Sequence, residues 1–162
     1  MIRNKEYGSN EIEKIKLKVP EKYKELDKGK NIYQNRYYNL NYNEKLDIFD
    51  YEVSYLLTTK TTKIKSQIDI INSSFSKAYG EYKYLTSSGK KEINGKEFQV
   101  YDGGYTELAG IMFTTTNRVR YYANIKVLFY ELSNGGYLVI KVKGNDSKIS
   151  DEILKDLTNF EI

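Results

Sequence analysis

The side chains that could carry out chemistry in this chain are hydroxyls, amines and carboxylates, because its 162 residues include no His and no Cys. A His-containing triad, a Cys nucleophile and an ordinary zinc site each need imidazole or thiolate. Tyr, by contrast, occurs 17 times. The residue types therefore argue against most catalytic and metal chemistry. We expect a chain that folds without a cofactor and binds no transition metal tightly.

A hairpin near the C-terminus sets the register of the first candidate binding site. Residues 118–132 alternate apolar and polar side chains as one long strand, and Asn134-Gly135 is typical of a two-residue type I′ turn. Such a turn pairs Phe129 with Ile140 and Val127 with Val142, so that apolar faces meet. We expect these four side chains to be buried under a helix.

The opposite face of this hairpin is predicted to be basic and to contain tyrosines. In the same register Lys126 lies opposite Lys143, and Leu128 lies opposite Lys141. A face of this kind suits phosphate, nucleic acid or an acidic protein patch, although an ordinary solvated face of a Lys-rich sheet has the same composition. The candidate ligand- or partner-binding residues are Arg118, Arg120, Tyr122, Lys126, Tyr130, Lys141 and Lys143.

Carboxylates offer two further possibilities. Asp102 precedes two glycines in an expected loop, with Glu107 nearby, and a glycosidase-like dyad needs its carboxylates about 5 to 9.5 Å apart. Asp146, Asp151 and Glu152 could surround a calcium ion, but they lack the spacing of an EF-hand loop. Acidic residues at the start of a helix ordinarily interact with its dipole, so we expect no metal site there.

Hydroxyls and tyrosines complete the set of candidates. Thr58 to Lys65 combine hydroxyls, three lysines and the start of a helix, which suits an anion, whereas capping of that helix by Thr61 or Thr62 explains the same pattern. The tyrosines expected on core faces are Tyr51, Tyr55 and Tyr121, and those expected on exposed faces are Tyr33, Tyr37, Tyr122 and Tyr130. Exposed Tyr favours a protein-binding surface over catalysis.

Strands are expected to position most of these residues. Alternating patterns predict strands over Ile15–Pro20, 32–42 and 46–57, with a hairpin at Asn43-Glu44 and another at Asn94-Gly95. Apolar residues at helical spacing predict one helix from Ile64 to Gly80, and Ser147 or Ser150 is placed to cap a second. The fold class is therefore α+β: an antiparallel β-sheet with two main helices.

Length and composition indicate one domain. We predict a polar N-terminal tail or tether over residues 1–14 and a single α+β domain over 15–162. The net charge of +4 is mild and mostly due to Lys, which is a weak indication of a nucleic-acid partner. The sequence has no apolar stretch of the roughly 20 residues that a transmembrane helix needs.

Three segments resemble parts of the PsbP-like fold family. Ile15 to Pro20 (IKLKVP) is similar to its opening strand, Ile93 to Phe98 (INGKEF) to its Asn-Gly hairpin, and Asp151 to Ile162 (DEILKDLTNFEI) to its closing helix. The resemblance implies an α/β/α sandwich and a binding, assembly or chaperone role. Many bacterial PsbP-like and DcrB-like members look like lipoproteins. This chain departs from the family pattern in its high Tyr content and in having no Trp.

The function predicted from the sequence is a non-enzymatic binding or assembly module that recognises a protein partner at a bacterial cell surface. That location is expected if an upstream signal or lipid anchor has been removed, and a cytoplasmic location if Met1 is the native start. One alternative is an anionic-polymer binder, for nucleic acid or a cell-wall polyanion, through the basic sheet face. The other is a carboxylate-dependent hydrolase.

Overall fold

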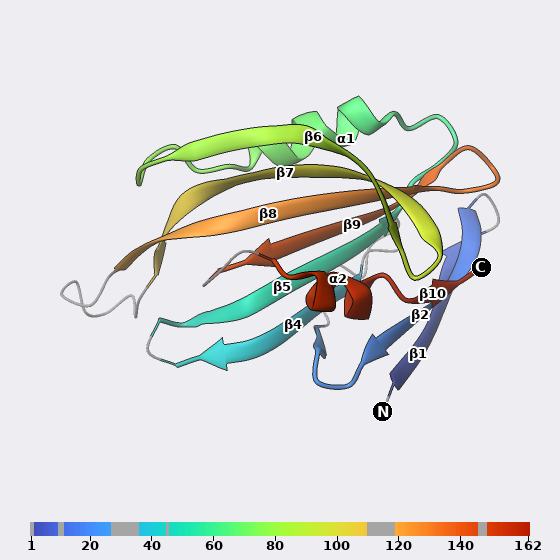
Figure 1. The fold of residues 1–162 in the computed structure, drawn as a ribbon, viewed down its shortest axis with the longest axis horizontal. Coiled ribbons are helices and arrows are strands. Elements are labelled where there is room, and N and C mark those ends of the chain that lie inside the picture. Colours follow the sequence, from blue (N-terminus) through green and yellow to red (C-terminus); the bar gives the residue numbers. More distant parts are fainter. Residues whose placement is uncertain (1, 10–11, 27–35, 45, 110–118, 146–148) are drawn as a thin grey trace.

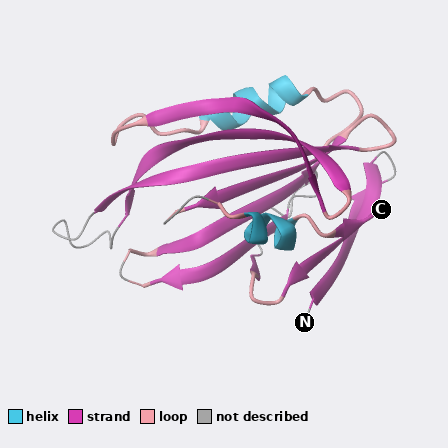
Figure 2. Cartoon of the chain, in the orientation of Figure 1, coloured by secondary structure: helices cyan, strands magenta, loops and turns pink. Residues whose placement is uncertain are grey.

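Long antiparallel strands dominate the computed structural model, which describes residues 2–9, 12–26, 36–44, 46–109, 119–145 and 149–162 (Figures 1 and 2). Within these residues the strands are β1 (Ile2–Ser9), β2 (Ile12–Pro20), β3 (Lys24–Leu26), β4 (Arg36–Asn43), β5 (Ile48–Leu57), β6 (Tyr82–Ile93), β7 (Lys96–Ala109), β8 (Val119–Glu131), β9 (Tyr137–Gly144) and β10 (Phe160–Glu161). The helices are α1 (Ile64–Ser73) and α2 (Asp151–Leu157).

The strands form one large and one small sheet. The large sheet has seven strands in the order β3-β4-β5-β9-β8-β7-β6, and the small sheet has three in the order β1-β2-β10. All neighbouring strands are antiparallel. The chain is thus a single α+β domain with a mostly antiparallel sheet and two helices, as the sequence predicted.

Both faces of the large sheet carry a core, because successive side chains of a strand point to opposite faces. On one face Leu128 and Ile140 pack with residues of α2 and of the small sheet. On the other face Val127 and Phe129 pack with residues of α1. The two helices therefore lie on opposite sides of the large sheet (Figure 1), which we call the α1 side and the α2 side.

The Asn94-Gly95 hairpin has the predicted conformation. Ile93 pairs with Lys96, and the two turn residues have φ values of 54° and 75°. Positive φ at both central positions is the requirement of a type I′ turn. The Asn94 side chain also donates a hydrogen bond of 2.8 Å to the backbone oxygen of Lys155, which attaches the turn to α2.

The register predicted for the Asn134-Gly135 hairpin is wrong by one residue. Phe129 pairs with Val139 and Leu128 pairs with Ile140, because the connection spans 132–136 instead of two residues. The end of β5 explains the longer loop. Tyr137 N donates to Thr58 Oγ1 at 2.8 Å, and a Cβ at Gly136 would lie 2.3 Å from the Thr58 backbone oxygen.

The structure also differs from the sequence predictions at the N-terminus. Residues 1–14 were expected to form a polar tail, whereas Ile2–Ser9 form β1 and pair with β2, which begins at Ile12. The backbone N–H and C=O groups of this segment therefore form hydrogen bonds with a neighbouring strand. In an unstructured tail they would bond to water instead.

The helix boundaries were predicted in part. Ser150 caps α2 by accepting a hydrogen bond of 3.3 Å from Ile153 N, as one of two expected caps. The N-cap of α1 is Lys63, with no side-chain cap bond, so neither Thr61 nor Thr62 has the expected role. α1 ends at Ser73, earlier than the predicted end at Gly80.

Candidate functional site

The predicted basic face does not exist as one surface, because the register shift divides its residues between the two sides of the sheet. Lys126 pairs with Val142, and Lys143 pairs with Ile125. Lys141 and Lys143 consequently lie on the α1 side, whereas Arg120, Tyr122, Lys126 and Tyr130 alternate onto the α2 side. Arg118, like Tyr33, lies outside the described residues.

Two residues of that set on the α2 side, Lys126 and Tyr130, have separate structural partners, and a third is exposed. Lys126 Nζ lies 3.2 Å from Asp102 Oδ1 in an ion pair. Tyr130 packs against Phe160, with ring centroids 5.1 Å apart, and is part of the core. Tyr122 is exposed, at 37% of its full area.

The predicted carboxylate dyad is absent from the described chain. Asp102 and Glu107 are in the middle of strand β7 instead of a loop, and five residues along a strand places them on opposite faces. Asp102 pairs with Lys126, whereas Glu107 pairs with Lys143. Asp151 pairs with Lys91 at the start of α2, and Asp146 lies outside the described residues. No three acidic residues in the described segments lie close enough together to hold a metal ion.

The α1 side instead contains a groove in which cations and carboxylates meet, which we call the ionic groove. It has a volume of about 400 Å³. Its polar lining includes Glu52 and Ser54 of β5 and Lys141 and Lys143 of β9. Its aromatic and apolar lining is Leu26, Tyr37, Phe49, Val53 and Tyr105. The groove therefore combines charge with an apolar wall.

Cross-strand pairing explains why the ionic groove lies next to the core under α1. Three cross-strand pairs of β5 and β9 lie on this side of the sheet. The first, Leu56–Val139, packs in the core under α1. The next pairs away from α1 are Ser54–Lys141 and Glu52–Lys143. Residues two apart along a strand share a face. The face is thus apolar near α1 and becomes polar two residues further along each strand.

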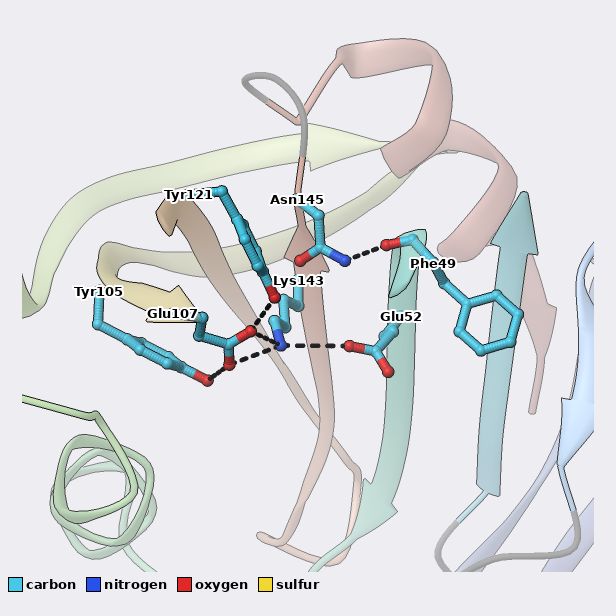
Figure 3. Close-up of polar contacts among 7 residues, drawn as sticks. All are labelled: Phe49, Glu52, Tyr105, Glu107, Tyr121, Lys143 and Asn145. Carbon is cyan, nitrogen blue, oxygen red and sulfur yellow. Dashed lines mark hydrogen bonds and ion pairs between the residues drawn. The ribbon is translucent and has the colours of Figure 1, made fainter. Parts of the chain in front are cut away.

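Glu107 is the centre of the hydrogen-bond network beside the groove (Figure 3). Lys143 Nζ lies 2.7 Å from its Oε1 and 2.6 Å from its Oε2. Tyr105 donates to Oε1 at 2.5 Å, and Tyr121 donates to Oε2. Lys143 also lies 3.3 Å from Glu52 Oε2, so it links carboxylates of β7 and β5.

The network shifts the pKa of each group in a direction that its contacts explain. Burial alone would raise the pKa of Glu107, but hydrogen bonds from Lys143, Tyr105 and Tyr121 hold it below its ordinary value. Burial and the hydrogen bond to Glu107 raise the pKa of Tyr105 and Tyr121. At neutral pH the network therefore contains an ionised Glu107 and two protonated phenols.

Asn145 joins the end of β9 to β5 beside this network (Figure 3). Its side-chain amide donates to the backbone oxygen of Phe49, and its backbone N–H donates to Asp50 O at 2.9 Å. Phe49 lines the ionic groove. Asn145 therefore helps to fix the start of β5 beside the ionic groove.

Lys141 differs from Lys143 in its surroundings. Its cross-strand neighbours are Ser54 and Val127, neither of which is charged. Over the described parts of the chain its ammonium makes no hydrogen bond or ion pair. Burial, together with the nearby Lys143 ammonium, lowers the pKa of Lys141. A half-buried cation therefore faces the groove without a described partner.

A second candidate surface lies at the edge strand β6, and we call Lys77, Tyr79, Tyr82 and Tyr84 the aromatic edge. The three tyrosines are 37%, 46% and 39% exposed, in sequence order. Lys77 Nζ lies 5.4 Å from the ring centroid of Tyr82 and 5.2 Å from that of Tyr84. A cation held over two neighbouring rings is thus presented at the surface.

A row of aromatic rings joins the aromatic edge to the ionic groove. Tyr82 packs on Tyr84 with centroids 5.4 Å apart, and Tyr84 packs on Phe75 at 6.2 Å. Phe75 in turn packs on Tyr105, at 4.9 Å, which lines the groove. Both candidate surfaces therefore belong to the α1 side of the molecule.

The sequence contained only partial signals for these sites. The sequence predicts Glu107 as a candidate carboxylate and Lys141 and Lys143 as candidate cations. Whether these side chains meet depends on three strand pairings, those of β5 with β9, β9 with β8 and β8 with β7. Tyr82 and Tyr84 were missed, although Tyr-Lys-Tyr alternation before Leu85 is a strand pattern that places both rings on one face.

No protein-family model and no curated protein sequence matches this chain. Among solved structures, the Saccharomyces cerevisiae Ran-binding protein Mog1p is similar over 99% of this chain and 96% of its own. The identity is 12% and the TM-score is 0.49.

Among the described residues, neither α1 nor α2 has the length and apolar character of a membrane-spanning helix.

Proposed function

We propose that this chain is a non-enzymatic binding module that recognises a protein partner through the aromatic edge. The observation that carries the proposal is the exposure of Tyr79, Tyr82 and Tyr84 side by side in one short stretch of the chain. Tyr buries a large area at low entropic cost and is enriched among the residues that dominate binding energy. Scattered exposed apolar residues are ordinary, but three exposed tyrosines within six residues, two of them in ring contact, are not.

The chemistry of the aromatic edge favours a partner that carries carboxylates. Lys77 is fully exposed and its ammonium lies over Tyr82 and Tyr84. The tyrosines offer hydroxyls as well as ring faces, and the chain has a net charge of +4. An acidic protein surface would pair with Lys77 while its apolar parts cover the rings.

The two alternatives have weaker support. Binding of an anionic polymer was inferred from one continuous basic face, and Lys141 and Lys143 lie on the other side of the sheet from Arg120 and Lys126. A carboxylate-dependent hydrolase was inferred from Asp102 and Glu107, which also lie on opposite sides. Glu107 has its oxygens occupied by Lys143, Tyr105 and Tyr121, which leaves it a poor general base.

The finer fold assignment, a PsbP-like α/β/α sandwich, is also a proposal. It is supported by the way the three resembling segments meet: Leu17 of β2 pairs with Phe160 of β10, and Phe160 packs at 6.3 Å from Phe98 beyond the Asn-Gly turn. With it we propose a location at the bacterial cell surface. Digestion of the protein by a protease added to intact source cells would support that location, and full protection until the cells are lysed would contradict it.

The binding proposal is tested by site-specific photo-crosslinking in the source cells. A benzoylphenylalanine side chain is placed at Tyr82 or at Tyr84, and we expect one discrete adduct with a second protein at both positions. The matched control is Tyr42, which is more exposed, at 51%, but lies on β4 at the far part of the sheet.

The positions that form an adduct decide between a specific interface and nonspecific labelling. An adduct at Tyr82 and Tyr84 but not at Tyr42 supports the proposal. Equal labelling at all three positions, no adduct at any of them, or an adduct with the mass of two copies of this chain would overturn it.

A further inference from the structure

The ionic groove contains one cation that folding leaves without a described partner. Lys143 is held by Glu107 at 2.6 Å and by Glu52 at 3.3 Å. Lys141, two residues earlier on the same strand and the same face, has Ser54 and Val127 as cross-strand neighbours. Taken over the residues that the structure describes, its ammonium has neither a hydrogen bond nor an ion pair.

A half-buried ammonium without a direct ion pair is unfavourable for folding, because the more distant carboxylates of Glu52 and Glu107 do not make up for its lost hydration. An apolar residue would continue the core from Val139, the preceding position on this face. The lowered pKa of Lys141 reports the same loss of hydration. A residue that costs stability at this position is better explained by a ligand than by the fold.

The walls of the groove restrict the ligand. Tyr37 and Tyr105 offer ring surfaces, Leu26 adds an aliphatic one, and Ser54 a hydroxyl beside Lys141. A volume of about 400 Å³ is in the range of small-molecule sites. Glu52 and Glu107 both pair with Lys143 and neither forms an ion pair with Lys141. The four charges sum to zero, and the Lys141 ammonium is the one of them that is left to pair with a ligand.

We infer that the ionic groove binds a small amphipathic monoanion, a carboxylic acid with an aromatic or aliphatic body, whose carboxylate pairs with Lys141 and whose body lies on the wall of Tyr37 and Tyr105. Glu52, with 42% of its side chain exposed, disfavours ligands of higher negative charge by repulsion. This site is separate from the aromatic edge and goes beyond the protein-binding role proposed above.

Calorimetric titration of the purified chain tests the inference with three monoanions: 4-phenylbutyrate, indole-3-acetate and octanoate. We expect at least one to bind at millimolar concentration or below, with roughly ten- to hundredfold weaker binding of its neutral amide, because the amide lacks the charge-assisted hydrogen bond. Inorganic phosphate is expected to bind more weakly than the best carboxylate.

Substitution of Lys141 separates a ligand role from a structural one. Lys141→Met should abolish the calorimetric binding while leaving the Tm unchanged or raised. The matched control Lys65→Met, on an exposed position of α1, should leave both unchanged.

Three results would overturn the inference. The first is no binding by any of the three carboxylates. The second is equal binding of acid and amide. The third is a Tm lowered by several degrees in Lys141→Met, which would show that folding itself uses this ammonium.

Discussion

Replacing Glu107 with Gln is the most informative perturbation of the hydrogen-bond network, because it removes one charge and changes little in shape. The Glu107 carboxylate receives Lys143 at 2.6 and 2.7 Å, Tyr105 at 2.5 Å, and Tyr121. In Glu107→Gln one of these acceptors becomes an amide N–H₂, which faces donors instead of accepting from them. Lys143 then keeps Glu52, at 3.3 Å, as its only ion-pair partner among the described residues.

The size of the effect follows from burial. Removing one partner of a fully buried ion pair costs about 3 to 5 kcal/mol. The Lys143 and Glu107 side chains retain 16% and 21% exposure, and Glu52 remains available, so we expect a smaller loss. Glu107→Gln should lower the free energy of unfolding by about 2 to 3 kcal/mol at pH 7, or the Tm by roughly 5 to 10 °C.

The stabilisation by Glu107 should depend on pH. The pKa of Glu107 in the folded protein lies below its ordinary value of 4.5. The unfolded chain therefore binds this proton more readily, and the stabilisation is complete above the ordinary pKa and is lost as the pH falls through the folded value. The stability gap between the natural protein and Glu107→Gln should be constant from pH 7 to about 5 and should narrow below about 4.5.

Urea unfolding at a series of pH values measures both quantities. The control is Glu52→Gln, whose carboxylate is 42% exposed and makes one contact of 3.3 Å, and which should cost at most about 1 kcal/mol. A Glu107→Gln protein as stable as the natural one at pH 7, or a gap that widens in acid, would refute the reasoning.

Three further predictions concern the hairpins and the absence of His and Cys. Gly136→Ala should destabilise the chain by about 2 kcal/mol or more in thermal melting, because its Cβ would lie 2.3 Å from Thr58 O. It should cost more than Gly135→Ala, where φ is 89° but a Cβ would make only an ordinary contact of 3.8 Å with Lys60 Cβ; the reverse order would contradict the close approach of Gly136 to Thr58. Asn94→Ala should lower the unfolding free energy by about 1 to 2 kcal/mol, since it removes the hydrogen bonds to α2 and places Ala at a φ of 54°; an unchanged urea midpoint would argue against that attachment. Thermal melts with and without a chelator should coincide, because the chain has no His or Cys, and a lower Tm with the chelator would reveal an oxygen-ligated ion.

The fold was predictable from the sequence where local turn chemistry determined it. Asn94-Gly95 forms the expected two-residue turn because both residues adopt positive φ. Asn134-Gly135 carries the same dipeptide, but contacts between Gly136 and Thr58 produce a longer loop. Thr58 is distant in sequence, so no local pattern could reveal this constraint.

The candidate site was less predictable because β8 and β9 are buried on both faces. Val127, Leu128 and Phe129 are consecutive and all buried, so apolar residues can be matched in more than one register. The slip by one residue moved Lys141 and Lys143 to the other face and brought Lys143 to Glu107. Pairing of residues this far apart in sequence depends on the packing of the whole sheet.

The central claim, that the aromatic edge binds a protein partner, is tested most directly by equilibrium binding to the protein captured by crosslinking at Tyr82. We predict that Tyr82→Ala/Tyr84→Ala weakens the affinity by roughly a hundredfold or more, as expected for residues that dominate an interface, with a Tm close to that of the natural protein. Tyr42→Ala should leave the affinity unchanged. An affinity of the double variant within a few-fold of the natural protein would contradict the account.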